Sequence, residues 1–335
     1  MKEPVRHTKH PWIVGIAVAA IAVAYFVLLS RNDFPEPGAN IEYDVEQYAA
    51  LDRVPTRFSE VDGIDPDFEN LRALSITPDG MYVAGEDVIA VFDNKDTETA
   101  RFTIDGTPNC LAVAPDGALF VGMPTRVQVL NADGTVQASW DDFSERSYLT
   151  SIAVNGDDVY IADAGTRVVY RYTRDGERLE TIGAKNDDRD IPGIEVPSPY
   201  LDLAVNDEGH LWVVNPGKLG MERYRENGEI VTSWYRPDLR LEGFSGCCNP
   251  THVAFSQDGR LITAEKGLVR IKVYDVTDGE YQELVAGSSL FPREQSLRDI
   301  AVDARDRVLV IDPRTDSIRI FELEETRDET ASQPA

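Results

Sequence analysis

The chain has 335 residues, of which 42 % are hydrophobic and 27 % charged, a composition typical of a globular protein rather than a collagen-like or wholly disordered one. Asp and Glu number 59 against 33 Lys and Arg, so the formal net charge at pH 7 is −26. Phosphate backbones repel such a polyanion, which argues against a nucleic-acid-binding role.

The first element along the chain is an apolar run, residues 12–30, that contains no charged side chain. As a helix this run would span about 28 Å, close to the thickness of a hydrocarbon core. Three basic residues precede it and only Arg31 closely follows it, so the positive-inside rule puts residues 1–11 in the cytoplasm. We therefore predict a single-pass signal anchor with the rest of the chain outside the cytoplasm (periplasmic or extracellular). A cleaved signal peptide is the alternative.

Two further segments are predicted to lie outside the main domain. Residues 31–52 contain Pro and Gly near their start and predict a stalk or linker. Residues 324–335 predict a disordered acidic tail.

Six copies of a sequence repeat fill the region between stalk and tail. Each copy has a short β-branched run, a tight polar turn such as Pro78-Asp79-Gly80, and a second short strand, which is a hairpin signal. A third strand follows in every copy and a fourth in the first five. This periodicity is typical of a β-propeller, whereas a β-sandwich does not predict it. The copies begin near residues 71, 110, 151, 202, 253 and 300.

The sixth copy ends at Phe321 after three strands, so a closed ring needs one strand from elsewhere. Residues 53–59 are the only spare strand-like segment, and we predict that they form the outer strand of the sixth blade. Closure of the ring removes strand edges that invite aggregation. The predicted fold is therefore all-β: a six-bladed β-propeller over residues 53–323, preceded by one transmembrane helix.

The segment IAVNGDDVYIAD, residues 152–163, resembles the NHL repeat, and the resemblance extends over residues 71–323. Residues 246–275, which begin with GCCNP, are similar to a stretch of uncharacterised bacterial NHL-repeat proteins with N-terminal membrane anchors. The resemblance implies a propeller outside a membrane. It leaves the activity open, because NHL-like propellers include scaffolds, ligand binders, gluconolactonase-type hydrolases and amidating lyases.

Loops of variable length mark one face of the predicted ring as functional. Short Asp-Gly hairpins occupy the opposite face, and long loops on a rigid scaffold are where binding residues accumulate. The long loops, residues 183–200, 236–251 and 287–297, all enter inner strands. We predict a binding or assembly module that takes a protein partner or a small ligand through this face.

One position just before each inner strand should surround a mouth of the central channel. Asp202, His252 and Asp299 at this position could coordinate a divalent, calcium-like cation, with Cys110 as a further ligand. Alternatively, such carboxylates bond the backbone amides of neighbouring strands. A metal there would suit a second hypothesis, a metal-dependent hydrolase or lyase, but no residue qualifies as a nucleophile and we favour a non-enzymatic role. The six residues are Ala73, Cys110, Ser151, Asp202, His252 and Asp299.

Cys247 and Cys248 are adjacent in the segment Gly-Cys-Cys-Asn-Pro. Thiols outside the cytoplasm are readily oxidised, and neighbouring cysteines can close a small disulfide ring in a tight turn. Three states stay open: a vicinal disulfide, a bridge from this pair to Cys110, and free thiols. Nothing in the sequence resembles the redox motif Cys-x-x-Cys.

Residues 265–272 introduce three positive charges into an otherwise acidic chain. Lys266 falls in a loop on the predicted functional face, whereas Arg270 and Lys272 alternate along one side of a strand. These cations either pair with neighbouring carboxylates, or Lys266 and Arg270 capture an anionic ligand. The ligand-binding candidates are therefore His252, Asn249, Lys266, Arg270 and Glu265.

Overall fold

The computed structural model describes residues 45–189, 191–291 and 296–324. The predicted anchor, the first part of the predicted stalk and nearly all of the predicted tail lie outside these ranges. None of the helices in the described part of the chain is long and apolar enough to cross a membrane.

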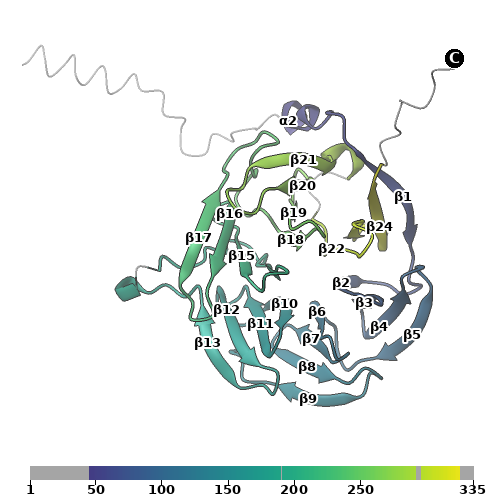
Figure 1. The fold of residues 1–335 in the computed structure, drawn as a ribbon, viewed down its shortest axis with the longest axis vertical. Coiled ribbons are helices and arrows are strands. Elements are labelled where there is room, and N and C mark those ends of the chain that lie inside the picture. Colours follow the sequence, from purple (N-terminus) through teal and green to yellow (C-terminus); the bar gives the residue numbers. More distant parts are fainter. Residues whose placement is uncertain (1–44, 190, 292–295, 325–335) are drawn as a thin grey trace, which may run out of the picture. The chain divides into compact units, whose positions relative to one another are not determined.

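Six four-stranded antiparallel sheets make up the described fold, and they follow one another around a ring (Figure 1). The predicted all-β, six-bladed β-propeller is therefore confirmed. The first sheet contains β2 (Leu71–Thr77), β3 (Gly80–Gly85), β4 (Val88–Asp93) and β5 (Glu98–Thr103), and the second β6 (Cys110–Val113), β7 (Leu119–Met123), β8 (Arg126–Leu130) and β9 (Val136–Trp140).

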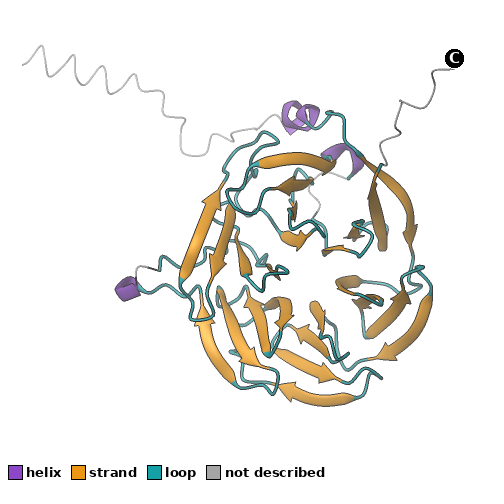
Figure 2. Cartoon of the chain, in the orientation of Figure 1, coloured by secondary structure: helices purple, strands orange, loops and turns teal. Residues whose placement is uncertain are grey.

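The next three sheets also use four consecutive strands each. Figure 2 shows the strands, in orange, arranged around the ring with loops between them. The third contains β10 (Leu149–Asn155), β11 (Asp158–Asp163), β12 (Val168–Thr173) and β13 (Arg178–Ile182). The fourth contains β14 (Leu203–Val205), β15 (Leu211–Asn215), β16 (Gly220–Tyr224) and β17 (Ile230–Tyr235). The fifth contains β18 (His252–Phe255), β19 (Leu261–Ala264), β20 (Ile271–Tyr274) and β21 (Tyr281–Ala286).

The sixth sheet takes strands from both ends of the described chain. It has the order β1 (Phe58–Ile64), β24 (Ser317–Leu323), β23 (Val308–Asp312) and β22 (Ile300–Val302). The outer strand comes from before the first repeat, but it begins five residues later than the predicted segment 53–59. Thr56 donates to the carbonyl of Leu284 at 2.6 Å, and Arg57 pairs with Glu283 at 2.7 Å, so this part of the segment lies along β21 of the fifth sheet instead.

The hydrophobic core lies between adjacent sheets. One cluster joins Ala73 and Ile89 of the first sheet to Leu119 and Val121 of the second. The middle strands are buried on both faces, whereas an outer strand such as β5 is largely exposed. Burial is therefore greatest in the middle strands and lower both in inner strands such as β2 and at the outer edge of the sheet. The inner strands of neighbouring sheets contact one another all the way around, including β2 with β22, so the ring is closed.

Three short helices complete the described elements. The helix α2 (Val45–Leu51) and Asp52 fall within the predicted stalk, but Asp52 is buried and its carboxylate pairs with Arg270 next to β20. The end of that segment is therefore part of the propeller rather than a linker. The two 3-10 helices are η1 (Asp187–Arg189) and η2 (Ser288–Leu290).

Candidate functional site

The inner strands surround a central channel of about 580 Å³. Five residues of the predicted ring line it: Cys110, Ser151, Asp202, His252 and Asp299. The sixth, Ala73, is fully buried in the core between the first two sheets, and Leu74 lines the channel in its place. We call these five polar residues the channel ring.

The two carboxylates of the channel ring hold neighbouring blades together. Asp202 accepts the amide of Leu203 on its own strand and the amide of Val253 on the next blade, both at 2.8 Å. Asp299 does the same for Ile300 and, on the adjacent first blade, for Leu74, at 2.8 and 2.7 Å. These contacts match the structural alternative raised by the sequence.

His252 lies beside Asp202, with its Nδ1 3.6 Å from the carboxylate and its Nε2 3.2 Å from the carbonyl of Leu297. Burial lowers the pKa of the imidazole, but the carboxylates of Asp202 and Asp299 raise it more, so the net pKa is above its ordinary value. Burial raises the pKa of Asp299 to about 7, and the nearby Asp202 adds to this rise while His252 opposes it.

The predicted calcium-like site finds no grouping of ligands in the structure. Within the described ranges, no three His, Cys, Asp or Glu side chains are placed so that they could hold a metal ion. Asp202 and Asp299 each use both oxygens for backbone amides, so they offer a cation few free lone pairs.

A second ring of six residues, one position earlier in each blade, lines a pocket of about 180 Å³ at the mouth of the channel. Arg72 and Thr150 each occupy the extra position of a β-bulge, a feature that redirects a side chain. This ring was not predicted from the sequence, although the same alignment of repeats shifted by one residue would have placed two arginines in it. We call it the mouth ring: Arg72, Asn109, Thr150, Leu201, Thr251 and Arg298.

The two arginines of the mouth ring differ from most of the other arginines that the structure describes. Neither Arg72 nor Arg298 has a hydrogen-bonded or ion-paired side-chain partner among the residues that the structure describes. The Nε of Arg72 is buried without a partner. Tyr148 and Tyr200 line the same pocket, and the Tyr200 ring meets His252 edge-on at a centroid distance of 6.4 Å. The mouth is therefore positively charged and partly aromatic.

Two predicted ligand-binding residues of the fifth blade, Arg270 and Glu265, are instead buried in ion pairs. The Nε of Arg270 lies 2.8 Å from Asp52, and its Nη1 donates to the carbonyl of Leu239 at 3.0 Å. Glu265 pairs with Lys272 at 2.8 Å and accepts the amide of Ser245 at 2.8 Å. Neither side chain is exposed, so the structure does not place Arg270 or Glu265 where a ligand could contact them.

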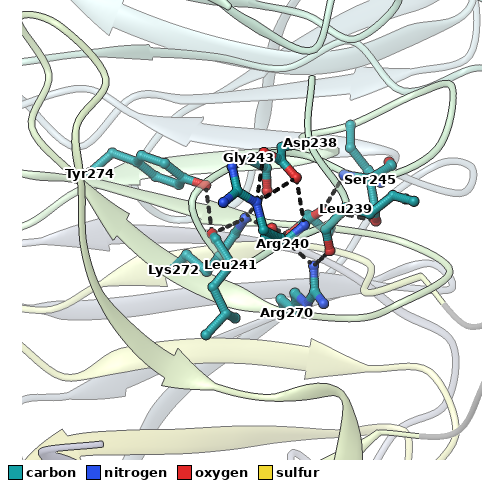
Figure 3. A network of polar contacts seen from close by, with 12 residues as sticks. Asp238, Leu239, Arg240, Leu241, Gly243, Ser245, Arg270, Lys272 and Tyr274 are labelled. Carbon is teal, nitrogen blue, oxygen red and sulfur yellow. Dashed lines mark hydrogen bonds and ion pairs between the residues drawn. The ribbon is translucent and has the colours of Figure 1, made fainter. Parts of the chain in front are cut away.

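The same two cations fasten the loop 236–251 to the blade. Lys272 donates to the carbonyls of Leu241 and Gly243 and lies 4.8 Å from the centroid of the Phe244 ring. Figure 3 shows these loop carbonyls turned toward Arg270 and Lys272. Much of a loop that we predicted to bind a partner is therefore folded onto its own blade.

Asn249 has a positioning role and Lys266 lies at the rim of the mouth. The Asn249 side chain accepts the amide of Lys266 at 2.9 Å and donates to its carbonyl at 3.2 Å, and the Asn249–Pro250 peptide bond is cis. The Lys266 ammonium donates to Ser198 at 3.1 Å and lies 4.8 Å from the centroid of the Tyr200 ring. Of the predicted candidates, His252 lines the mouth pocket and Lys266 adjoins one of its walls.

All three cysteines are free thiols in the structure. The Sγ atoms of Cys247 and Cys248 are 3.1 Å apart, near Lys266, and Cys248 is buried while Cys247 is exposed. Cys110 is buried in the channel ring, where burial raises the pKa of its thiol well above the ordinary value. The vicinal disulfide stays a prediction.

Comparison with known proteins shows the fold and no family. No family model matches the sequence, and no curated protein is significantly similar to it. The structure is similar to a streptogramin B lyase (13 % identity, TM-score 0.55, covering 79 % of this chain and 97 % of that one) and to virginiamycin B lyase from Staphylococcus aureus (14 %, 0.54, 79 % and 99 %). It is equally similar to the WD40 β-propeller domain of Doa1 (12 %, 0.54, 82 % and 100 %). Two lyases and a WD40 domain share this architecture, so it does not select an activity.

Proposed function

We propose that this chain is a membrane-anchored, extracytoplasmic β-propeller that binds a ligand or a protein partner at the mouth of its channel. The observation behind the proposal is a pocket that continues into the channel. The mouth pocket and the channel share Asn109, Thr150, His252 and Arg298 among their lining residues. Concave sites with a few convergent polar groups are the usual form of a binding site.

The three long loops support the same location. Each of them ends at the mouth pocket, where Tyr200, Thr251 and Leu297 are lining residues from loops 183–200, 236–251 and 287–297 respectively. A ligand seated in the pocket would therefore touch all three loops. A protein partner would rest on them and insert a side chain.

The binding part of the proposal can be tested by filling the pocket. Ser296 lines the mouth, and Ser296→Trp would place an indole there, whereas Ser139→Trp changes an exposed residue of the outer strand β9. Saturation-transfer NMR of the full chain in detergent, against a fragment library of mixed charge, should find binders that Ser296→Trp loses and Ser139→Trp keeps. If wild type binds no fragment, or both variants bind the same set, the proposal fails.

The location can be tested separately with fusions at the C-terminus. Alkaline phosphatase is active only outside the cytoplasm, so a fusion after Ala335 should be active and should stay in the membrane fraction after an alkaline carbonate wash. The predicted anchor, residues 12–30, has this orientation because basic residues precede it. An inactive fusion, or one released by the wash, would contradict the location but not the binding site.

A hydrolase or lyase is the second candidate function, and one contact favours it. The imidazole of His252 adjoins both cavities and lies 3.6 Å from Asp202, so the pair could act as a general base on a bound molecule. Because both Asp202 oxygens already accept backbone amides, we rank this candidate below simple binding. Turnover of a bound fragment that is abolished by His252→Gln would reverse the ranking.

A further inference from the structure

We infer that the ligand at the channel mouth bears a carboxylate or phosphate group, gripped by Arg72 and Arg298, on a flat body that packs against Tyr148 and Tyr200. This inference rests on the proposed function and specifies the chemistry of its ligand. It also assigns a binding role to residues that the predicted site did not include.

The guanidinium groups of Arg72 and Arg298 have no partners among the described residues. An arginine in a protein stays charged and presents donors in a planar fork that matches an oxyanion. Most other arginines in the described ranges already use such donors: Arg126, which lines a neighbouring pocket with Arg72, reaches the Asp105 carboxylate at 3.6 Å and its carbonyl at 2.5 Å. Arg72 and Arg298 have no such partner there, in a chain with 59 acidic residues.

One donor of the Arg72 side chain is unsatisfied. The Nε of Arg72 is buried and makes no hydrogen bond within the described structure. Burying an unpaired polar atom costs free energy, and an oxygen of a bound ligand would offset that cost. The residue belongs to the mouth ring, and its side chain lines the mouth pocket where an oxyanion would sit.

The two arginines lie on adjacent blades. Arg72 belongs to β2 of the first blade, and Arg298 directly precedes the inner strand β22 of the sixth blade. The strands β2 and β22 are in contact where the ring closes. Both side chains line the same 180 Å³ pocket, so one small oxyanion can contact both.

Aromatic side chains line the pocket that would hold the body of the ligand. Tyr148 is partly exposed at 37 %, and it lines the pocket together with Tyr200 and Pro199. Aromatic walls favour flat or ring-shaped groups. Lys266 sits against the Tyr200 ring and adds positive charge at the rim. These features select an aromatic acid or an aryl phosphate over a sugar or a cation.

The test uses probes that share a phenyl ring and carry an anionic, a neutral or a cationic polar group. Benzoate and phenyl phosphate should bind the full chain in NMR titrations, while benzyl alcohol and benzylamine should bind at least about tenfold more weakly. Arg298→Gln changes an exposed residue and should weaken both anions about tenfold without affecting folding. Arg72→Gln should do the same, and Arg72→Lys should recover part of the affinity because it keeps the charge. Arg126→Gln is the matched control and should leave both affinities unchanged.

Each outcome separates the inference from the proposed function. Benzyl alcohol binding as tightly as the anions, or benzoate affinity unchanged in Arg298→Gln, would overturn the anion inference. If that neutral binding is lost in Ser296→Trp, the proposed binding site survives. If wild type binds neither these probes nor any library fragment, both fail. Inorganic phosphate binding as tightly as phenyl phosphate would reject the aromatic contact.

Discussion

Two pairs of cations in this acidic propeller differ in their surroundings. In the fifth blade, Arg270 and Lys272 are fully buried, and each pairs with a carboxylate and with loop carbonyls. At the channel mouth, Arg72 and Arg298 line a pocket and have no hydrogen-bonded or ion-paired partner among the described residues. Positive charge has a structural role in the fifth blade, whereas at the channel mouth we propose that it binds a ligand.

The role of a cation in this protein depends on which residues cover it. The loop 236–251 folds over β20 and offers its carbonyls to Arg270 and Lys272, which removes both from solvent. Among the residues that the structure describes, no loop offers its carbonyls to Arg72 or Arg298, and the mouth ring surrounds a pocket. The largest effects on stability should therefore come from the fifth blade, and the smallest from the mouth.

The strongest test of the comparison is Lys272→Met. It would leave the buried Glu265 carboxylate without its cation, and breaking one side of a buried pair costs about 3–5 kcal/mol of unfolding free energy. Urea unfolding of the full chain should show this loss, with partial recovery in Lys272→Met/Glu265→Gln. The control is Lys185→Met, whose exposed partner Asp187 should make the change nearly neutral. A loss below about 1 kcal/mol for Lys272→Met would contradict the structural role.

The second test is Asp52→Ala, which removes the carboxylate that pairs with Arg270 and accepts the Ser288 amide at 3.1 Å. Since Arg270 keeps the carbonyl of Leu239 as a partner, we expect a loss of about 3 kcal/mol. The helix α2 should also loosen, so limited trypsin digestion should cut faster after Arg53. Asp62→Ala, at an exposed position of β1, is the control. Unchanged digestion would mean that α2 does not depend on this ion pair.

The third test is the pH dependence of stability, which depends on Asp299 of the channel ring. Asp299 has a folded pKa of about 7 against an ordinary value of 3.8, so its stabilising effect is largest at low pH and is lost as pH rises toward 7. The wild type should therefore lose stability relative to Asp299→Asn between pH 4.5 and 7.5, by at most about 1.4 kcal/mol per pH unit. His252, whose pKa is also raised, adds a slope of the same sign in both proteins. A difference that does not vary with pH would refute this assignment.

The smallest effect is expected at the mouth. Because Arg72 and Arg298 lose no partner that the described structure contains, Arg72→Gln and Arg298→Gln should each change the unfolding free energy by less than about 0.5 kcal/mol. The same urea titration measures it. A loss above about 2 kcal/mol in either variant would mean that the mouth cations are structural after all, and the comparison would collapse.

The repeats predicted the fold because hairpin turns and alternating strands are local signals. Short polar turns, such as the Asp116-Gly117 turn with a φ of +87° at Gly117, recur in each copy and divide the chain into hairpins. Counting strands also showed that one must come from before the first repeat. The bounds of that strand were off by five residues because Thr56 and Arg57 bond to the fifth blade, a contact between distant parts of the sequence.

The site was harder to predict for the same physical reason. Alternation along the sequence placed Arg270 and Lys272 on one side of a strand, but whether that side faces solvent was decided by a loop that folds over it. The mouth ring depends on bulges that redirect Arg72 and Thr150, and pairing between strands creates them. Local patterning therefore determined the blades and their number. The tertiary structure decided which charges are buried and which are free, because burial is a property of neighbours that the sequence does not place side by side.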